Sequence, residues 1–482
     1  MKGRHRFFGV LLLALFGAVA CGGGSVGSVA TPAPRPTSAG PATAAQLDDL
    51  EHRSFNYFWD SANPDNGLVP DRYPTRTFAS VAAVGFALTA YPVGVERGWV
   101  SRAAAASRTL LTLQFLRDLP QGDAPTGTAG FHGLFYHFLD LTTGLRFQTN
   151  ELSPIDTALL MAGVLAAEQY YTGADATESA VRAVAEALYQ RVEWDWLADV
   201  EGLIAMGWKP ETGVFSARWV GYNEAMLLYV LALGSPTHPV PPTAWTGWTR
   251  GYDRTWGTEF GQTYLRFPPL FGHQYSHLWI DFNGIQDAYM KAKNSDYFRN
   301  SRAATYAQQA YAARNALGYS GYDAQVFGVT ACDGPGALTL VVNGVSRTFL
   351  GYAGRGMGGI DTYDDGTLAP TGVVSSIVFA PEIVLPAIAA LLARYGDYLY
   401  GPYGFLDAFN ATVPDSAPVQ SGRVIPGKGW VDVDYLGIDE GPIVGMIENY
   451  RTGLIWTLMR TNPAIKHGLK AAGFSGGWVD TP

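Results

Sequence analysis

Two short strings, far apart in the chain, each hold a carboxylate in an apolar, glycine-rich setting. Glu224 lies in the string WVGYNEAM (219–226), and Asp439 lies in LGIDEGPI (436–443). A carboxyl group serves as a general acid near neutral pH only where its surroundings raise its pKa, and the apolar residues after Glu224 would do so by burial. Glycosidic bond cleavage needs one protonated acid and one ionised partner. The pair therefore indicates acid and base chemistry, although two capping or buried structural acids would give the same pattern.

Polar and aromatic residues suited to binding a sugar accompany these acids. Aromatic rings pack against the C–H faces of sugars, and polar side chains bind the hydroxyl groups. Trp219, Tyr222 and Trp279 are stacking candidates, and a place in the core would explain each equally well. Capping and turn formation are the alternatives for most of the polar candidates. These are Glu151, Asp156, Asn223, His277, Asp281, Asp333, Asp365 and Glu440.

We expect no metal site. His277 and Asp281 are four residues apart, a helical spacing that would suit a pair of metal ligands. The eight histidines of the chain form no cluster with further acidic residues, however. No organic cofactor is expected either.

The composition is that of a globular protein with a neutral partner. Of the 482 residues, 48% are hydrophobic and only 16% are charged, which favours a large compact core. The formal net charge of −9 argues against nucleic acid, which requires a basic surface. Aromatic residues make up 13% of the chain; part of them must belong to the core, and the remainder are candidates for lining a groove.

The N-terminal segment resembles an export signal. Basic residues precede an apolar run from Phe7 to Val19, and small residues precede Cys21. We interpret residues 1–20 as a lipoprotein signal peptide and Cys21 as the lipidated residue, with an ordinary secretory signal cleaved near Ala20 as the alternative. Either reading exports the protein. The lipid anchor would hold it at a bacterial membrane, in the periplasm or at the cell surface, and would be its only membrane contact.

Residues 21–45 read as a flexible tether rich in Gly, Ser, Pro and Thr, and residues 46–482 as one domain. The apolar stretch from Val373 to Ala393 contains Pro381, Glu382 and Pro386, so we expect a loop and a buried helix there, not a membrane span.

Helical periodicity dominates the domain. Hairpins are expected at 134–147, around Thr142-Thr143-Gly144, and at 338–352, around Asn343-Gly344. Few strands and many helices predict an all-α fold, and helices of similar length joined as hairpins commonly close into a toroid. The helices are expected at 45–62, 78–93, 100–118, 154–171, 176–192, 221–233, 283–292, 296–316, 381–395 and 440–460.

An ordered set of motifs resembles the glucoamylase-like family of bacterial hydrolases, which includes the endo-β-1,2-glucanases of glycoside hydrolase family 144. The motifs are ELSPIDTALL (151–160), GYNEAM (221–226), GSPTHP (234–239), WIDF (279–282), DYFRNS (296–301) and IENYRTGLIW (447–456). The resemblance implies an (α/α)6 toroid that hydrolyses β-1,2-glucan or its oligosaccharides with inversion and without a cofactor. It implies Glu224 as general acid and Asp439 as general base.

Three features depart from that pattern. Glu440 stands where relatives have Gln, which leaves the base open between Asp439 and Glu440. Asn283 stands where Arg is expected, and the hairpin around Asn343 is an elaboration that would narrow the cleft. The alternatives are the same fold acting on another glucan, a transglycosylase, a polysaccharide lyase, or a surface glycan-binding lipoprotein without catalysis.

Overall fold

The computed structural model describes residues 40–76, 78–358 and 362–481, which form a helix-rich unit. Cys21, the signal peptide and most of the tether lie outside the described residues. The helices are α1 (Ala44–Ser61), α2 (Val81–Glu96), α3 (Arg102–Asp118), α4 (Pro154–Tyr170), α5 (Ala176–Gln190), α6 (Met226–Gly234), α7 (Thr243–Thr249), α8 (Tyr252–Thr255), α9 (Tyr275–Trp279), α10 (Ala288–Ala292), α11 (Tyr297–Arg314), α12 (Pro370–Val374), α13 (Pro381–Leu399), α14 (Gly437–Arg451), α15 (Leu454–Thr461) and α16 (Pro463–Ala471).

The strands are short and, among the described residues, form only two- and three-stranded sheets. They are β1 (Arg72–Tyr73), β2 (Ala79–Ser80), β3 (Gly130–Phe131), β4 (Leu134–Phe135), β5 (Phe138–Leu139), β6 (Trp256–Glu259), β7 (Gln262–Leu265), β8 (Ala331–Cys332), β9 (Leu338–Val342), β10 (Val345–Phe349), β11 (Ala353–Gly354), β12 (Tyr400–Gly401), β13 (Gly404–Phe405), β14 (Phe409–Asn410), β15 (Arg423–Ile425), β16 (Gly429–Val431) and β17 (Tyr435–Leu436). Three 3-10 helices, η1 (Trp194–Leu197), η2 (Leu270–His273) and η3 (Gly477–Val479), complete the elements.

Local sequence signals set most helix starts. The side chains of Ser80, Ser101 and Ser153 accept hydrogen bonds from free backbone N–H groups at the starts of α2, α3 and α4. Asp175 and Asp296 do the same for α5 and α11. These signals explain why the longer helices were predicted nearly in full.

Three helix predictions were wrong in extent. The helix expected from residue 221 begins only at Met226, because the preceding residues form a turn in which Gly221 has a φ of 85°. The helix expected over 283–292 covers only 288–292. The long helix expected over 440–460 is two helices, α14 and α15, separated at Gly453, whose φ is 70°.

The two predicted hairpins had different outcomes. Strands β9 and β10 pair as expected around Asn343 and Gly344, whose φ values of 51° and 79° suit a tight hairpin turn. In the 134–147 segment the tip forms, because Leu139 bridges to Arg146. The prediction for the rest of that hairpin was wrong, because β4 pairs with β3 and β5 pairs with β2.

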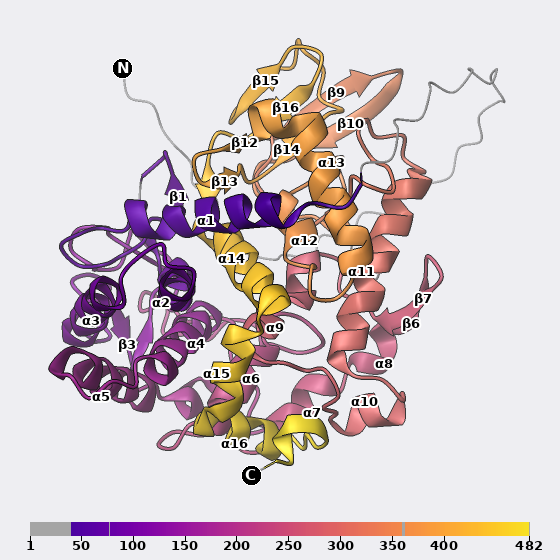
Figure 1. Ribbon diagram of the computed structural model, residues 1–482. Helices are drawn as coiled ribbons and strands as arrows, with labels where there is room; N and C mark the ends of the chain where they lie inside the picture. Colours follow the sequence, from indigo (N-terminus) through magenta and orange to yellow (C-terminus); the bar gives the residue numbers. More distant parts are fainter. Residues whose placement is uncertain (1–39, 77, 359–361, 482) are drawn as a thin grey trace. The chain divides into compact units, whose positions relative to one another are not determined.

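Close helix contacts depend on glycine. A Cβ on Gly85 of α2 would lie 2.3 Å from the carbonyl oxygen of Leu159 in α4, and one on Gly163 of α4 would lie 2.0 Å from the carbonyl oxygen of Gly85. The two helices therefore pack backbone to backbone. Helix α2 also packs on α14, which contacts α1, so α14 has neighbours from the far end of the sequence (Figure 1).

The apolar stretch after Val373 forms the end of α12 and then α13, and α13 continues through Pro386. No helix in the described part of the chain combines the length and the apolar character that crossing a membrane requires.

Candidate active site

Glu224 lies in the turn just before α6, not inside a helix as expected. Ser276 of α9 holds this turn, because its hydroxyl donates to the Glu224 carbonyl (3.0 Å) and accepts from the Leu227 N–H (3.0 Å). Oε2 of Glu224 is buried and has no hydrogen-bond partner among the described residues. Burial, with a contribution from the charge of Asp156, raises the pKa of Glu224 to about 7. Glu224 can therefore hold a proton near neutral pH.

Asp439 lies in the first turn of α14 and is buried. Its backbone carbonyl accepts a hydrogen bond from the Thr371 hydroxyl of α12 (3.3 Å). Burial raises the pKa of its carboxyl to about 7, and a hydrogen bond with the carboxyl of Asp407 acts in the opposite direction. Asp439 can therefore change protonation state in the same pH range as Glu224.

Tyr275, at the start of α9, lies near both acids. Its hydroxyl donates to the carbonyl of Ile438, next to Asp439 (2.9 Å). Burial raises its pKa well above the usual value, and the charges of both Asp439 and Glu224 add to this effect. One tyrosine hydroxyl is thus within electrostatic range of both carboxylates, although the two lie on separate helix starts.

An acidic cluster surrounds Asp439, and three chain segments build it. Asp333 follows β8, Asp407 precedes β14 and Asp432 follows β16. Because β14 and β16 pair antiparallel, the start of β14 lies beside the end of β16. One oxygen from each of the three carboxylates lies within 4.8 Å of the others. Burial and the neighbouring charges raise the pKa of Asp407 and Asp432 well above the usual value.

Arg72 supplies positive charge to this cluster. Its Nη1 bonds Oδ2 of Asp333 (2.6 Å), and its Nε bonds Asp71 (3.1 Å). The cluster is the one group of carboxylates in the described residues with a spacing suited to a cation. Because Asp333 is already paired with Arg72, we do not assign the cluster as a metal site.

A second charged group lies beside Glu224. His137, between β4 and β5, has Nδ1 3.0 Å from Glu151 and Nε2 3.5 Å from Asp156. Burial lowers the pKa of His137, but the two carboxylates outweigh it and raise the pKa to about 9. The hydrogen bond and the charge of His137 overcome the effect of burial on Glu151 and lower its pKa to about 2. Glu151 and Asp156, both predicted from the sequence, thus lie with a cationic imidazolium.

Comparisons with known proteins identify the family of the chain. Residues 216–463 match the family described as "putative glucoamylase", and this segment holds both Glu224 and Asp439. A solved structure named as a putative glucoamylase from Bacteroides fragilis is 32% identical, covers 92% of this chain and 100% of that one, and has a TM-score of 0.76. The chain belongs to the glucoamylase-like family.

Two further relatives of this glucoamylase-like chain have named substrates. An endo-β-1,2-glucanase from Chitinophaga pinensis, solved with sophorotriose and glucose, is 27% identical, covers 90% of this chain and 99% of that one, and has a TM-score of 0.75. An exo β-1,2-glucooligosaccharide sophorohydrolase from Parabacteroides distasonis is 28% identical over 456 residues. That match covers 88% of this chain but only 57% of the relative, so the chain spans little more than half of its length. These relatives are consistent with the assignment to glycoside hydrolase family 144 that the motifs predicted.

Several residues that the sequence favoured are core residues of the glucoamylase-like domain. Trp279 is fully buried and donates its Nε1–H to Thr89 (2.9 Å), and His277 is fully buried against Ser301 (3.1 Å). Tyr222 stacks on Tyr297 with ring centroids 5.9 Å apart. Trp219 is also buried. The stacking prediction is therefore not supported for these aromatic residues.

Other predicted residues have structural partners. Asp281 pairs with Arg460, and Oδ1 of Asn223 accepts the N–H of Ala225 (3.0 Å) to form the turn before α6. Asp365 forms two hydrogen bonds with the guanidinium of Arg355 (2.8 and 2.9 Å), and both side chains are fully buried. Each of these three side chains therefore has a structural partner within the protein, and none of them requires a ligand to account for its position.

Glu440 lies on a different side of α14 from Asp439. Its carboxyl is buried near Ser54 of α1 and Gly404, and burial raises its pKa well above the usual value. Asp439, by contrast, is grouped with Asp407 and Asp333. The arrangement favours Asp439 of the two as a base.

The sequence analysis missed Arg72, His137, Tyr275, Asp407 and Tyr352. Tyr352, in the loop between β10 and β11, is 41% exposed. Enclosure by the protein and the charges of Asp439 and Asp407 raise the pKa of its hydroxyl. Tyr352 therefore lies near the carboxylates of the site and is partly exposed to solvent.

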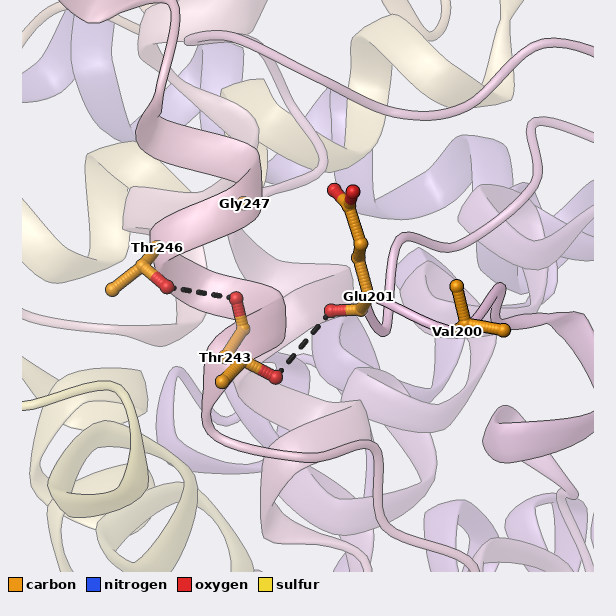
Figure 2. A pocket seen from close by; sticks show the side chains of 5 residues that line it. All are labelled: Val200, Glu201, Thr243, Thr246 and Gly247. Atoms are coloured by element: carbon orange, nitrogen blue, oxygen red, sulfur yellow. Dashed lines mark hydrogen bonds between the residues drawn. The ribbon is translucent and has the colours of Figure 1, made fainter.

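A surface hollow of about 410 Å³ lies apart from these residues, between the 200–201 loop and α7 (Figure 2). Its lining contains one carboxylate, Glu201, which is paired with Arg250 (2.7 Å) at the surface. The hydroxyls of Thr243 and Thr246 bond to backbone carbonyls. This hollow lacks the paired acids that glycosidic cleavage requires.

Proposed function

We propose that the chain is an inverting glycoside hydrolase that acts on β-1,2-glucan or its oligosaccharides, with Glu224 as general acid and Asp439 as general base. The observation that carries the proposal is that Glu224 and Asp439 each have a buried carboxyl oxygen without a hydrogen-bond partner among the described residues, and that α9 contacts the backbone beside both acids through Ser276 and Tyr275. Burial raises the pKa of each carboxyl to about 7. Relatives named as β-1,2-glucan hydrolases support the substrate class.

Each acid has a distinct part in the reaction. Glu224 gives its proton to the glycosidic oxygen as the bond to the anomeric carbon breaks. Asp439, ionised, takes a proton from the water that attacks the opposite face of the sugar. Inversion requires room for that water, so the carboxyl groups should lie about 6.5–9.5 Å apart once substrate is bound, or further apart if a relay extends the path.

The contacts among the helices support an (α/α)6 toroid as the scaffold. Helices α2, α4, α6 and α9 contact one another in chain order, and α9 and α12 both contact α14, which returns to α2. Gln274, just before α9, donates to Gly372 of α12 (2.8 Å) and so links these two helices. Five of these six are preceded by a helix of a second layer: α1, α3, α5, α11 and α13.

The charge of the site favours a neutral substrate. Asp333, Asp407, Asp432 and Asp439 lie together, with Arg72 as the nearby cation. A uronate polymer would bring further negative charge into this group, at an energetic cost. A polysaccharide lyase is therefore the weaker alternative.

Product analysis tests the proposal. The domain from residue 46 should release sophorose-series products from linear β-1,2-glucan, and none from β-1,3-glucan, β-1,4-glucan or starch. Their size distribution separates endo from exo action, and nuclear magnetic resonance of the first product gives its anomeric form. A folded protein that leaves all four polymers intact would contradict the proposal. Glucan binding measured by calorimetry, without product, would support a glycan-binding protein. Transfer of the glycosyl group to an added acceptor sugar would support a transglycosylase.

Export and lipidation at Cys21 complete the proposal. The support is the sequence alone: a basic segment, an apolar run and small residues before the cysteine. Mass spectrometry of the N-terminal peptide from the membrane fraction tests it, and an unmodified cysteine would refute it.

A further inference from the structure

Tyr352 is an exposed aromatic residue in the loop between β10 and β11, and 41% of it is accessible to solvent. In the described part of the chain, its ring packs on no other aromatic ring and its hydroxyl has no hydrogen-bond partner. A single exposed tyrosine needs no explanation by itself. The backbone that carries this one, however, is held by a buried ion pair.

Arg355 holds the loop immediately before Tyr352. Nη2 of its guanidinium donates to the backbone carbonyls of Leu350 (3.1 Å) and Gly351 (3.0 Å). Asp365 fixes this guanidinium (2.8 and 2.9 Å), and its Oδ2 also accepts the backbone N–H of Leu350 (3.2 Å). A side chain on a backbone held in this way loses little freedom when it meets a ligand, which favours binding.

The same guanidinium joins this loop to the segment that follows β8. Its Nη1 donates to the carbonyls of Cys332 (2.6 Å) and Asp333 (3.3 Å). Strands β8 and β11 pair antiparallel, with Ala353 opposite Cys332. Tyr352 precedes this pair of residues and Asp333 follows it, so the antiparallel register brings Tyr352 and Asp333 side by side.

Asp333 connects Tyr352 to the candidate active site. Its carboxylate pairs with Arg72 (2.6 Å), and the two side chains are 13% and 24% exposed, respectively. Arg72 lies opposite Leu436 in the pairing of β1 with β17, and α14, with Asp439 in its first turn, begins directly after β17. An exposed ring and an accessible pair of charged side chains therefore lie together, near the start of the helix that holds the proposed base.

The electrostatic surroundings of Tyr352 agree with this placement. Burial is the largest cause of the raised pKa of its hydroxyl, and the charge of Asp439 is the next. Smaller contributions come from Asp407, Asp333 and Asp71. A side chain that is 41% exposed, and yet enclosed by enough protein for burial to dominate, lies in a concave part of the surface.

We propose that Tyr352 is a substrate-binding residue whose ring stacks on the C–H face of a glucosyl unit, while Asp333 and Arg72 bind hydroxyl groups of that unit. This inference rests on the proposed function, because it places one unit of the β-1,2-linked chain beside Asp439. An aromatic face and a few fixed polar groups are what sugar binding requires. Oδ2 of Asp333 accepts from Arg72, which leaves Oδ1 for a sugar hydroxyl.

Three substitutions separate sugar stacking from other roles. Tyr352→Ala removes the ring, and Tyr352→Phe keeps the ring but removes the hydroxyl. Tyr450→Ala is the matched control, because Tyr450 is 39% exposed and lies at the opposite end of α14 from Asp439. Circular dichroism of each variant establishes that it is folded.

The first measurement is kcat and KM on a β-1,2-gluco-oligosaccharide. Tyr352→Ala should raise KM about tenfold or more and keep kcat within about threefold, because stacking contributes to binding and not to proton transfer. Tyr352→Phe and Tyr450→Ala should keep KM within about twofold. A folded Tyr352→Ala variant whose KM stays within about twofold would overturn the proposal. An increase in Tyr352→Phe as large as that in Tyr352→Ala would also overturn it, because the hydroxyl and not the ring face would then be responsible.

A second measurement does not depend on turnover. Carbon-13 nuclear magnetic resonance of Glu224→Gln protein labelled at the tyrosine rings follows the Tyr352 signal, identified by its absence when Tyr352→Phe is added, during titration with sophorotriose. The Tyr352 signal should shift as the sugar saturates the protein, and the Tyr450 signal should not.

The outcomes for the binding residue and for the proposed function are distinguishable. Cleavage of glucan by the unmodified protein, with a Tyr352 signal that does not move at saturation, would refute the role of Tyr352 alone. A shift of this signal in a protein that cleaves no glucan would support the role of Tyr352 and refute the proposed function. A protein that neither binds sophorotriose nor cleaves glucan would refute both.

Discussion

Changing the pH perturbs the two proposed catalytic groups directly. Activity requires Glu224 protonated and Asp439 ionised at the same time. As the pH falls, Asp439 takes up a proton and the base is lost; as the pH rises, Glu224 loses its proton and the acid is lost. The rate should therefore follow a bell-shaped curve whose two limbs belong to different residues.

The magnitude follows from the two pKa values. With both at about 7, roughly one quarter of the molecules are in the working form at pH 7, and about 25-fold fewer at pH 5 or pH 9. Raising the pKa of Glu224 from 4.5 to about 7 corresponds to about 3 kcal/mol of preference for the neutral acid. Without these shifts, the optimum would lie near pH 4.

The assay is kcat/KM on a β-1,2-gluco-oligosaccharide from pH 4 to pH 10, since this ratio reports the groups of the free enzyme. Glu224→Gln should lower kcat at least about 1,000-fold with little change in sugar affinity, and its residual rate should lack the alkaline limb. A substrate with an acidic phenol as leaving group should recover much of the loss, because departure then needs no proton. An optimum near pH 4, or an alkaline limb that persists in Glu224→Gln, would refute the assignment.

Three other predictions concern stability and are measured by urea unfolding. Asp365→Asn leaves the buried Arg355 guanidinium without its carboxylate and should cost about 3–5 kcal/mol; a loss under 1 kcal/mol would contradict the role of this pair. Gly163→Ala should destabilise by about 3 kcal/mol or more because its Cβ meets the backbone of α2, whereas the matched control Gly396→Ala, whose Cβ meets nothing within 4 Å, should be neutral or stabilising. The folded state raises the pKa of His137 from 6.5 to about 9, so the contribution of His137 to the free energy of unfolding is complete below pH 6.5 and is lost as the pH rises through 9. The difference in the free energy of unfolding between the unmodified protein and His137→Gln should therefore narrow over that interval. A difference that stays constant would argue against an imidazolium.

The sequence could predict what depends on local signals. Serine and aspartate caps and apolar periodicity located most of the longer helices, and the Asn343-Gly344 pair located one hairpin. Glu224 stood out because its neighbours are apolar. The sequence left Trp279 and Tyr222 open between sugar stacking and the core, because an aromatic residue has the same sequence pattern in both places, and the structure has both side chains buried.

The missed residues depend on contacts between distant segments. Asp407 is brought to Asp432 by the pairing of β14 with β16, two-residue and three-residue strands without an alternating pattern. His137 lies in a loop and Arg72 in the two-residue strand β1, and the neighbours of each along the chain give no sign of a site. Only the tertiary structure shows that Arg72 and His137 pair with carboxylates of the site and that Asp407 lies among them.

The crossing of α2 and α4 at Gly85 and Gly163 has a consequence for local unfolding. At both glycines the backbone of one helix lies against carbonyl oxygens of the other, which allows Cα–H···O contacts between α2 and α4. No side chain separates the two backbones there, so no change of rotamer can admit water between them. Amide protons at this crossing should therefore exchange with solvent only when the whole domain unfolds, among the slowest in the protein. Asp156 is in the first turn of α4, so the charged group beside Glu224 is attached to a part of the domain that does not open during a catalytic cycle.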